Sequence, residues 1–206
     1  MRIYLDNCCY NRPYDDQRQL RISLETQAKL DIQKRIRKGQ FELVSSFVLI
    51  YEISKSPNIL SAQSIRIFVE NFSSVYVSDS KLSQIEAIAE KIQETGIKKM
   101  DSWHVACAVM ADADYFLTTD KRLLKYKSDT VKMIADMDIM SRGIACLIRE
   151  LGIVEAETFI SYIKNENFDY TKWRQDKFDD LTLSEIGQRA ADYEKNHPFK
   201  GNATII

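Results

Sequence analysis

Up to residue 135, short apolar segments with strand-like composition alternate with longer segments whose apolar residues recur at helical spacing. The strand-like segments are predicted at residues 2–6, 41–44, 74–77, 115–118 and 131–135. Strands that are separated by helices align in parallel, and helices then cover both faces of the sheet. The alternation therefore predicts an α/β fold with a central parallel sheet flanked by helices.

After residue 135 the strand-like segments stop. Helices are predicted at residues 138–151, 154–165, 171–178 and 184–196, and residues 201–206 are expected to be a loose end. We therefore divide the chain into an α/β domain, 1–135, and an all-helical C-terminal extension, 136–206. The first part holds 20 Lys and Arg against 17 Asp and Glu, a net charge of +3, and the second holds 9 against 13, a net charge of −4. This difference predicts that the acidic extension docks on the basic body.

The composition limits the class of protein. The chain is 45% hydrophobic and 29% charged, and its net charge of −1 argues against binding nucleic acid through bulk charge alone. No signal peptide is recognisable, and no stretch of about 18 apolar residues could cross a membrane. We therefore expect a soluble cytoplasmic protein. The four cysteines include the adjacent pair Cys8 and Cys9 but no C-x-x-C pattern, which predicts free thiols.

Four carboxylates are expected near the carboxyl ends of the strands, where open parallel sheets collect their ligands. Asp6 ends the first predicted strand, Asp120 follows the fourth, and Asp101 opens a helix that packs on the sheet. Glu52 follows five apolar or aromatic residues, where a buried carboxylate needs a compensating cation. Each acid also has a structural explanation: a helix cap for Asp101 and Asp120, a turn for Asp6 and a solvated helix edge for Glu52.

Four carboxylates in one small cleft repel each other strongly, and a hard divalent cation compensates that repulsion. Mg²⁺ or Mn²⁺ bound by oxygen ligands keeps several waters and can contact a phosphate. It lowers the pKa of a bound water and stabilises the charge that builds on a phosphodiester. We therefore predict a site for one or two such ions at this edge of the sheet.

Three segments, in this order, resemble the PIN-domain family: MRIYLDNCCYNRPYDD, FELVSSFVLIYEI and KKMDSWHVACAVMADADYFLTTDKRLL. The resemblance implies a metal-dependent endoribonuclease whose metal-binding and catalytic residues are Asp6, Glu52, Asp101 and Asp120. Many members of the family are VapC-like toxins of bacterial toxin–antitoxin pairs, which cleave RNA and are silenced by a small antitoxin partner. The resemblance also implies a homodimer.

Substrate contacts are expected around the same acids. The candidates are Asn7, Arg12, Thr118, Thr119, Lys121 and Arg122. Lys and Arg bind RNA phosphates, although solvated surface charge explains the three basic residues equally well. His104, three residues after Asp101, is predicted to be a packing or hydrogen-bonding histidine, and Trp103 a packing residue.

Two classes of phosphatase do not fit the residues after the first predicted strand. A haloacid-dehalogenase-type phosphatase needs a second Asp two residues after the first, where Cys8 stands, and a cysteine phosphatase needs an Arg where Tyr14 and Asp15 stand. The strongest alternative is a catalytically silent PIN-fold module that binds RNA or protein.

The extension resembles the small partners of such nucleases, which suggests an antitoxin-like module in cis, although it could instead complete the core or a dimer. If it inhibits, removing residues 140–206 should raise activity.

Overall fold

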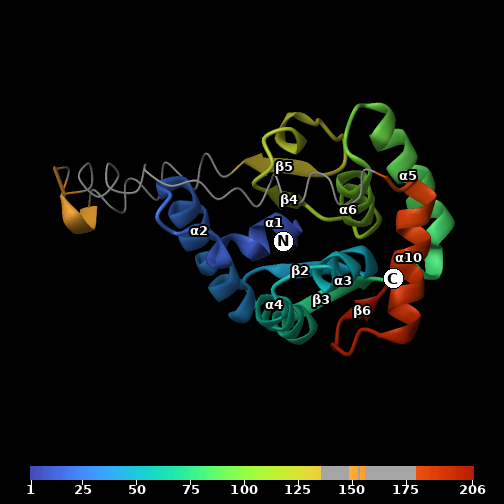
Figure 1. The fold of residues 1–206 in the computed structure, drawn as a ribbon, viewed down its shortest axis with the longest axis horizontal. Helices are drawn as coiled ribbons and strands as arrows, with labels where there is room; N and C mark the ends of the chain where they lie inside the picture. Colours follow the sequence, from blue (N-terminus) through green and yellow to red (C-terminus); the bar gives the residue numbers. More distant parts are fainter. Residues whose placement is uncertain (136–148, 153, 156–179) are drawn as a thin grey trace.

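The computed structural model describes residues 1–135, 149–152, 154–155 and 180–206. Its centre is a sheet in which every pair of neighbouring strands is parallel, in the order β5-β4-β1-β2-β3-β6 (Figure 1). The strands are β1 (Arg2–Leu5), β2 (Glu42–Ser46), β3 (Ser73–Val77), β4 (Tyr115–Thr118), β5 (Lys132–Ala135) and β6 (Thr204–Ile205). The predicted α/β class, a parallel sheet flanked by helices, is confirmed.

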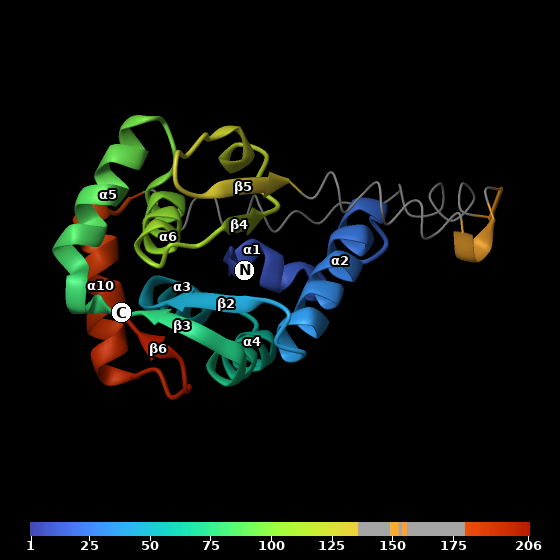
Figure 2. The same ribbon diagram turned by 180° about the vertical axis from the view of Figure 1, so that it is seen from behind.

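Helices connect the strands and cover the sheet (Figure 2). They are α1 (Asn7–Asn11), α2 (Leu20–Arg37), α3 (Phe47–Ser54), α4 (Ile59–Phe72), α5 (Leu82–Glu94), α6 (Lys99–Met110) and α10 (Leu183–Asn196), with short 3-10 turns η1 (Arg12–Tyr14), η2 (Asp79–Lys81) and η3 (Leu123–Lys125). Ser46 caps the start of α3, because its side chain accepts a hydrogen bond from the Leu49 amide. Within the described residues, no helix has the length and apolarity needed to cross a bilayer.

The strand order places a topological switch at β1. The chain runs from β1 through β2 to β3 on one side, and then returns to the other side of β1 to form β4 and β5. The carboxyl ends of β1 and β4 therefore lie next to each other, and the Asp6 amide donates to the Leu117 carbonyl at 2.9 Å. Ligands of open α/β sheets bind in the crevice at such a switch.

The C terminus of the chain is part of this sheet. β6 pairs with β3, with Thr204 opposite Val75 and Ile205 opposite Tyr76. The expectation of a loose end at residues 201–206 is therefore wrong, and the extension is not all-helical. Of its predicted helices, 184–196 is confirmed as α10. The helices predicted at 138–151, 154–165 and 171–178 fall mainly outside the described residues.

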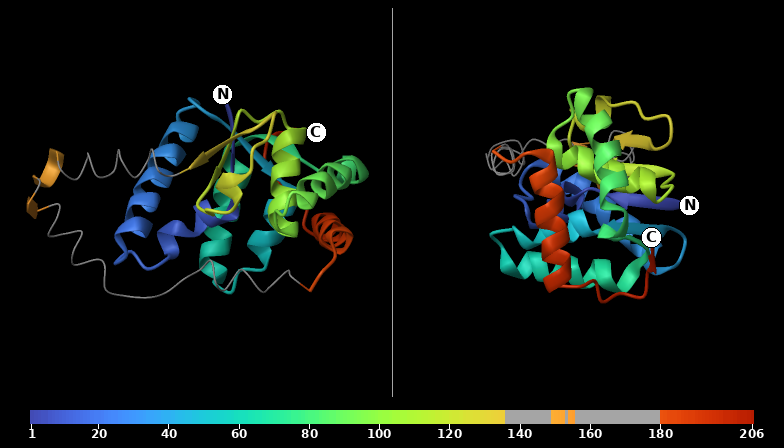
Figure 3. Two further views of the ribbon diagram at one scale, coloured as in Figure 1. Left: turned by 90° about the horizontal axis from the view of Figure 1, so that it is seen from above. Right: turned by 90° about the vertical axis from the view of Figure 1, so that its right-hand side faces the viewer.

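α10 packs against α3, α5 and α6, and it lies beside α5 at the end of the molecule opposite α2 (Figures 1 and 3). Its buried face is apolar and contains Leu183, Ile186, Ala190 and Ala191. The indole nitrogen of Trp103 on α6 donates to the Leu183 carbonyl at 2.9 Å. Residues 180–206 therefore share one core with the α/β domain.

α10 lies directly against Trp103 of α6 at Gly187. A Cβ atom added at Gly187 would overlap the ring of Trp103, which is fully buried. An exposed helical Gly gains about 0.5–1 kcal/mol of stability on replacement by Ala. Here we expect the opposite sign, because steric overlap in a packed core costs about 1–3 kcal/mol. Gly187→Ala should therefore lower the midpoint of thermal unfolding by about 3–10 °C.

Ser184→Ala is the matched control, because Ser184 lies on the exposed face of the same helix. Its free energy of unfolding should change by less than about 0.5 kcal/mol. Equal midpoints for Gly187→Ala and the wild type would contradict the close contact between α10 and Trp103.

Candidate metal centre

Asp6 lies at the carboxyl end of β1, directly before α1, and its side chain is fully buried. Its Oδ2 accepts a hydrogen bond from Thr118 Oγ1 at 2.7 Å and one from the Cys8 thiol at 3.0 Å. Thr118 ends β4, so both strands at the topological switch contribute to this contact. The position predicted for Asp6, at the carboxyl edge of the sheet, is confirmed.

Glu52 comes from the only charged position of α3, a helix whose residues from Phe47 to Ile53 are all buried. Glu52 has only 4% of its surface exposed, so the alternative of a solvated helix edge is wrong. Its Oε2 lies 2.8 Å from Nε2 of His104 on α6. Burial of an ionised carboxylate is costly unless hydrogen bonds or a cation stabilise it.

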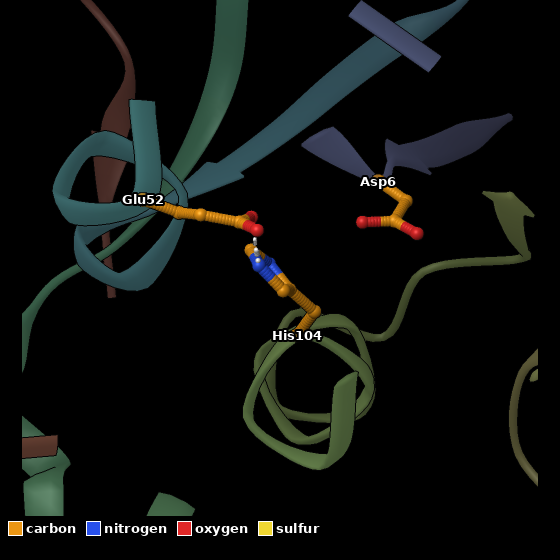
Figure 4. A group of neighbouring side chains, drawn as sticks. All are labelled: Asp6, Glu52 and His104. Carbon is orange, nitrogen blue, oxygen red and sulfur yellow. Dashed lines mark hydrogen bonds and ion pairs between the residues drawn. The ribbon is translucent and has the colours of Figure 1, made fainter. Parts of the chain in front are cut away.

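Asp6, Glu52 and His104 meet in one place. Each can offer one ligand atom such that all three atoms lie within 4.8 Å of one another. Figure 4 shows the Glu52 and His104 side chains pointing toward each other, with Asp6 facing them from the end of β1. Three different segments of the chain are thereby brought together at the topological switch.

This donor set could hold a divalent cation. It offers two carboxylates and one imidazole, all with less than a tenth of their surface exposed. Carboxylate oxygens suit hard divalent cations, and an imidazole nitrogen is accepted by several transition metals. Two buried negative charges so close together also repel each other, and a bound cation would compensate that repulsion.

Asp101 and Asp120 are not among these three residues. Asp101 is buried and lies in the first turn of α6. It is not the cap residue, because the helix begins at Lys99 and Lys98 occupies the cap position. Asp120 is half-buried, and its Oδ1 accepts from the Arg122 amide at 2.7 Å. Their membership of a four-carboxylate site remains a prediction.

Arg12 was expected in a loop that could contact substrate. It is instead 5% exposed and forms ion pairs with Glu25 of α2 and with Asp15. It also donates to Thr119 Oγ1 at 2.8 Å. Burial alone lowers the pKa of Arg12, but the adjacent carboxylates, led by Glu25, raise it overall. Arg12 is therefore buried and contacts the segment after β4, while its contact with a substrate remains a prediction.

The other predicted substrate contacts divide into two groups. Asn7, Thr118 and Thr119 are buried, and Asn7 accepts a hydrogen bond from Asn11 through its side-chain oxygen. Lys121 and Arg122 are exposed directly after Asp120, as a contact with a phosphate backbone would require. Thr118 lies beside Asp6, as expected of a residue near the acids, and the substrate contacts of all five residues remain predictions.

The cysteines are consistent with a reduced protein. Cys8, Cys9 and Cys107 are buried thiols that form no disulfide with one another, while Cys146 lies outside the described residues. Burial raises the pKa of the Cys107 thiol to about 12, so it stays protonated in the core.

His104 is the residue that sequence analysis left out of the site. The hydrogen-bonding role expected of it is confirmed, but its partner is one of the proposed metal ligands. Its spacing of three residues from Asp101 was the available signal, since residues three apart share a helix face.

The chain matches no protein-family model, no curated protein and no solved structure, so its function must be inferred from these residues and their geometry.

Proposed function

We propose that this chain is a divalent-metal-dependent endoribonuclease of the PIN-domain type. The observation that carries the proposal is the convergence of buried Asp6 and Glu52 at the topological switch of a parallel sheet. One ligand atom from each lies within 4.8 Å of the other and of a ring nitrogen of His104. The order of the acidic motifs along the sequence supports the same family.

The roles of the residues follow from their positions. Asp6 and Glu52 would hold Mg²⁺ or Mn²⁺, and Asp101 and Asp120 would complete the acidic site. When bound, the ion would activate a water and stabilise the charge that develops on the phosphodiester. Exposed Lys121 and Arg122 would contact the RNA phosphates next to Asp120.

The proposal extends to biological context through the family resemblance. A cytoplasmic toxin of a toxin–antitoxin pair would act as a homodimer and be silenced by an antitoxin-like partner. The acidic C-terminal segment is the candidate for that partner in cis. Part of it, α10, packs against α3, α5 and α6 through a buried apolar face.

A second function, RNA or protein binding without cleavage, is favoured by one observation. Asp101 and Asp120 are not in the three-residue group that meets around His104. A site with two close carboxylates could bind a cation for structural reasons alone.

The test is cleavage of single-stranded RNA by the full-length protein with Mn²⁺ or Mg²⁺. We expect cleavage with either ion, none in excess EDTA, and recovery when the ion is restored. The reason is that the cation activates the attacking water and stabilises the charge on the phosphodiester. Glu52→Gln, purified in parallel, controls for contaminating nucleases and should be inactive. RNA binding without cleavage in any divalent metal would favour the silent module.

A further inference from the structure

Behind Glu52 lies a buried series of hydrogen bonds, the Tyr4–His104 network, made of Ser46, Tyr4, His104 and Glu52. Ser46 Oγ lies 2.7 Å from the Tyr4 hydroxyl, which lies 2.8 Å from His104 Nδ1. His104 Nε2 then lies 2.8 Å from Glu52 Oε2. The network links β2, β1, α6 and α3, and none of its members reaches a tenth of its surface in solvent.

The chemistry of the groups fixes the direction of the last bond. Glu52 binds a cation as a carboxylate, which only accepts hydrogen bonds, so in that state Nε2 of His104 carries a hydrogen and donates it to Glu52. The Tyr4 side chain is a hydroxyl that can donate or accept, and its oxygen lies 2.8 Å from Nδ1 of His104. Tyr4 thus holds the opposite nitrogen of the same imidazole.

Packing restricts the two rings further. The Tyr4 ring stacks on Phe116 with centroids 5.3 Å apart and an angle of 8° between the planes. The Tyr4 and His104 rings meet edge to face at 5.9 Å. An imidazole held at both nitrogens and at one edge presents its N–H to Glu52 in a single orientation.

The same geometry separates two roles for His104. To bind a cation through Nε2, His104 would have to give up the hydrogen that it donates to Glu52. Nδ1, the other nitrogen, is occupied by Tyr4. Both ring nitrogens are therefore engaged in hydrogen bonds to other side chains, as expected of a residue that orients a metal ligand.

We propose that Tyr4 and His104 are positioning residues that hold the Glu52 carboxylate in the orientation in which it binds a divalent cation. The inference rests on the proposed metal site and adds to it the residues that set the geometry of one ligand. It predicts that metal affinity depends on buried groups that do not touch the ion.

The experiment measures Mn²⁺ binding to the full-length protein by the electron paramagnetic resonance signal of free Mn²⁺. His104→Leu, which removes the N–H, should bind Mn²⁺ about 10- to 100-fold more weakly, as for other residues that orient metal ligands. Tyr4→Phe keeps the stacked ring but removes the hydroxyl, and it should weaken binding by about 10-fold. His104→Gln places an amide N–H near the position of Nε2 and should restore most of the affinity.

Tyr10→Phe is the matched control. Tyr10 is also fully buried, and its hydroxyl has no hydrogen-bond partner among the described residues. Its Mn²⁺ affinity should equal that of the wild type. Thermal unfolding without metal identifies any variant that fails to fold, and Tyr4→Phe decides the question if His104→Leu is unfolded.

The outcomes are distinct. Wild-type affinity in folded Tyr4→Phe would overturn the positioning role, as would a directly coordinated nitrogen in the pulsed resonance spectrum of the Mn²⁺-loaded protein. If the wild type binds no Mn²⁺, the metal site and the positioning role both fail. If it binds Mn²⁺ but cleaves no RNA, only the ribonuclease proposal fails, and the affinities still test the network.

Discussion

Replacing Asp6 by Asn is expected to reduce metal-dependent RNA cleavage by at least about 100-fold. Asn has nearly the same shape as Asp and can still accept the hydrogen bond from Thr118 Oγ1, so the local structure should be retained. The change removes one of two buried negative charges that would attract the cation. The measurements are the rate of single-stranded RNA cleavage and the affinity for Mn²⁺, and both should fall.

The stability of this variant, unlike its activity, should not fall. Without metal, the buried carboxylate of Asp6 is costly, since burial disfavours a charge that no cation neutralises. Asp6→Asn should therefore unfold in EDTA at a temperature no lower than the wild type. Loss of activity with retained stability separates a metal-binding role from a structural one.

Asp31→Asn is the matched control for Asp6→Asn. Asp31 lies on the exposed part of α2, where it pairs with Arg35. An exposed pair of this kind contributes about 0–1 kcal/mol, so stability and cleavage should both be close to those of the wild type. RNA cleavage that survives Asp6→Asn would show that the site assignment is wrong.

The strands of the α/β domain could be predicted because each is a short apolar segment between helices. α1 and η1 could not, since they are too short to show a helical period and directly follow β1. β6 was missed for a related reason. Its two residues form a strand only because β3 offers a free edge, and that edge exists only in the folded chain.

The candidate site shows the same division. Asp6 and Glu52 could be found because a carboxylate after an apolar strand or helix start is conspicuous in the sequence. The role of His104 depends on Tyr4, which is brought beside it by the pairing of β1 with β4 and the packing of α6. The burial of Arg12 could not be predicted, because its partner Glu25 lies on a different helix and no local pattern reveals that ion pair.

Removing residues 180–206 distinguishes the two roles considered for the C-terminal segment. If these residues inhibit the enzyme, the shortened protein should cleave RNA faster. The packing of α10 leads us to expect the opposite. Ile186 is fully buried and Leu183 nearly so, and burial of each such side chain stabilises a protein by about 1.5–3 kcal/mol.

The loss would extend beyond those two side chains. Removal of α10 would expose Trp103 and the side of α3 on which Tyr51 meets the Tyr193 ring, and removal of β6 would leave β3 as an open edge. A typical domain has only about 5–15 kcal/mol of stability in total. We therefore expect the midpoint of thermal unfolding to fall by more than about 10 °C, or the cooperative transition to disappear.

A graded control separates the helix from the strand. A protein that lacks only residues 204–206 loses the β6 pairing but keeps α10, so its midpoint should fall by less than that of the longer deletion. RNA cleavage should be measured for each protein that remains folded. A folded protein without residues 180–206 that cleaves RNA faster than the wild type would support inhibition by these residues. It would also contradict their role in the core, because α3 and α6 would then hold Glu52 and His104 in place without α10.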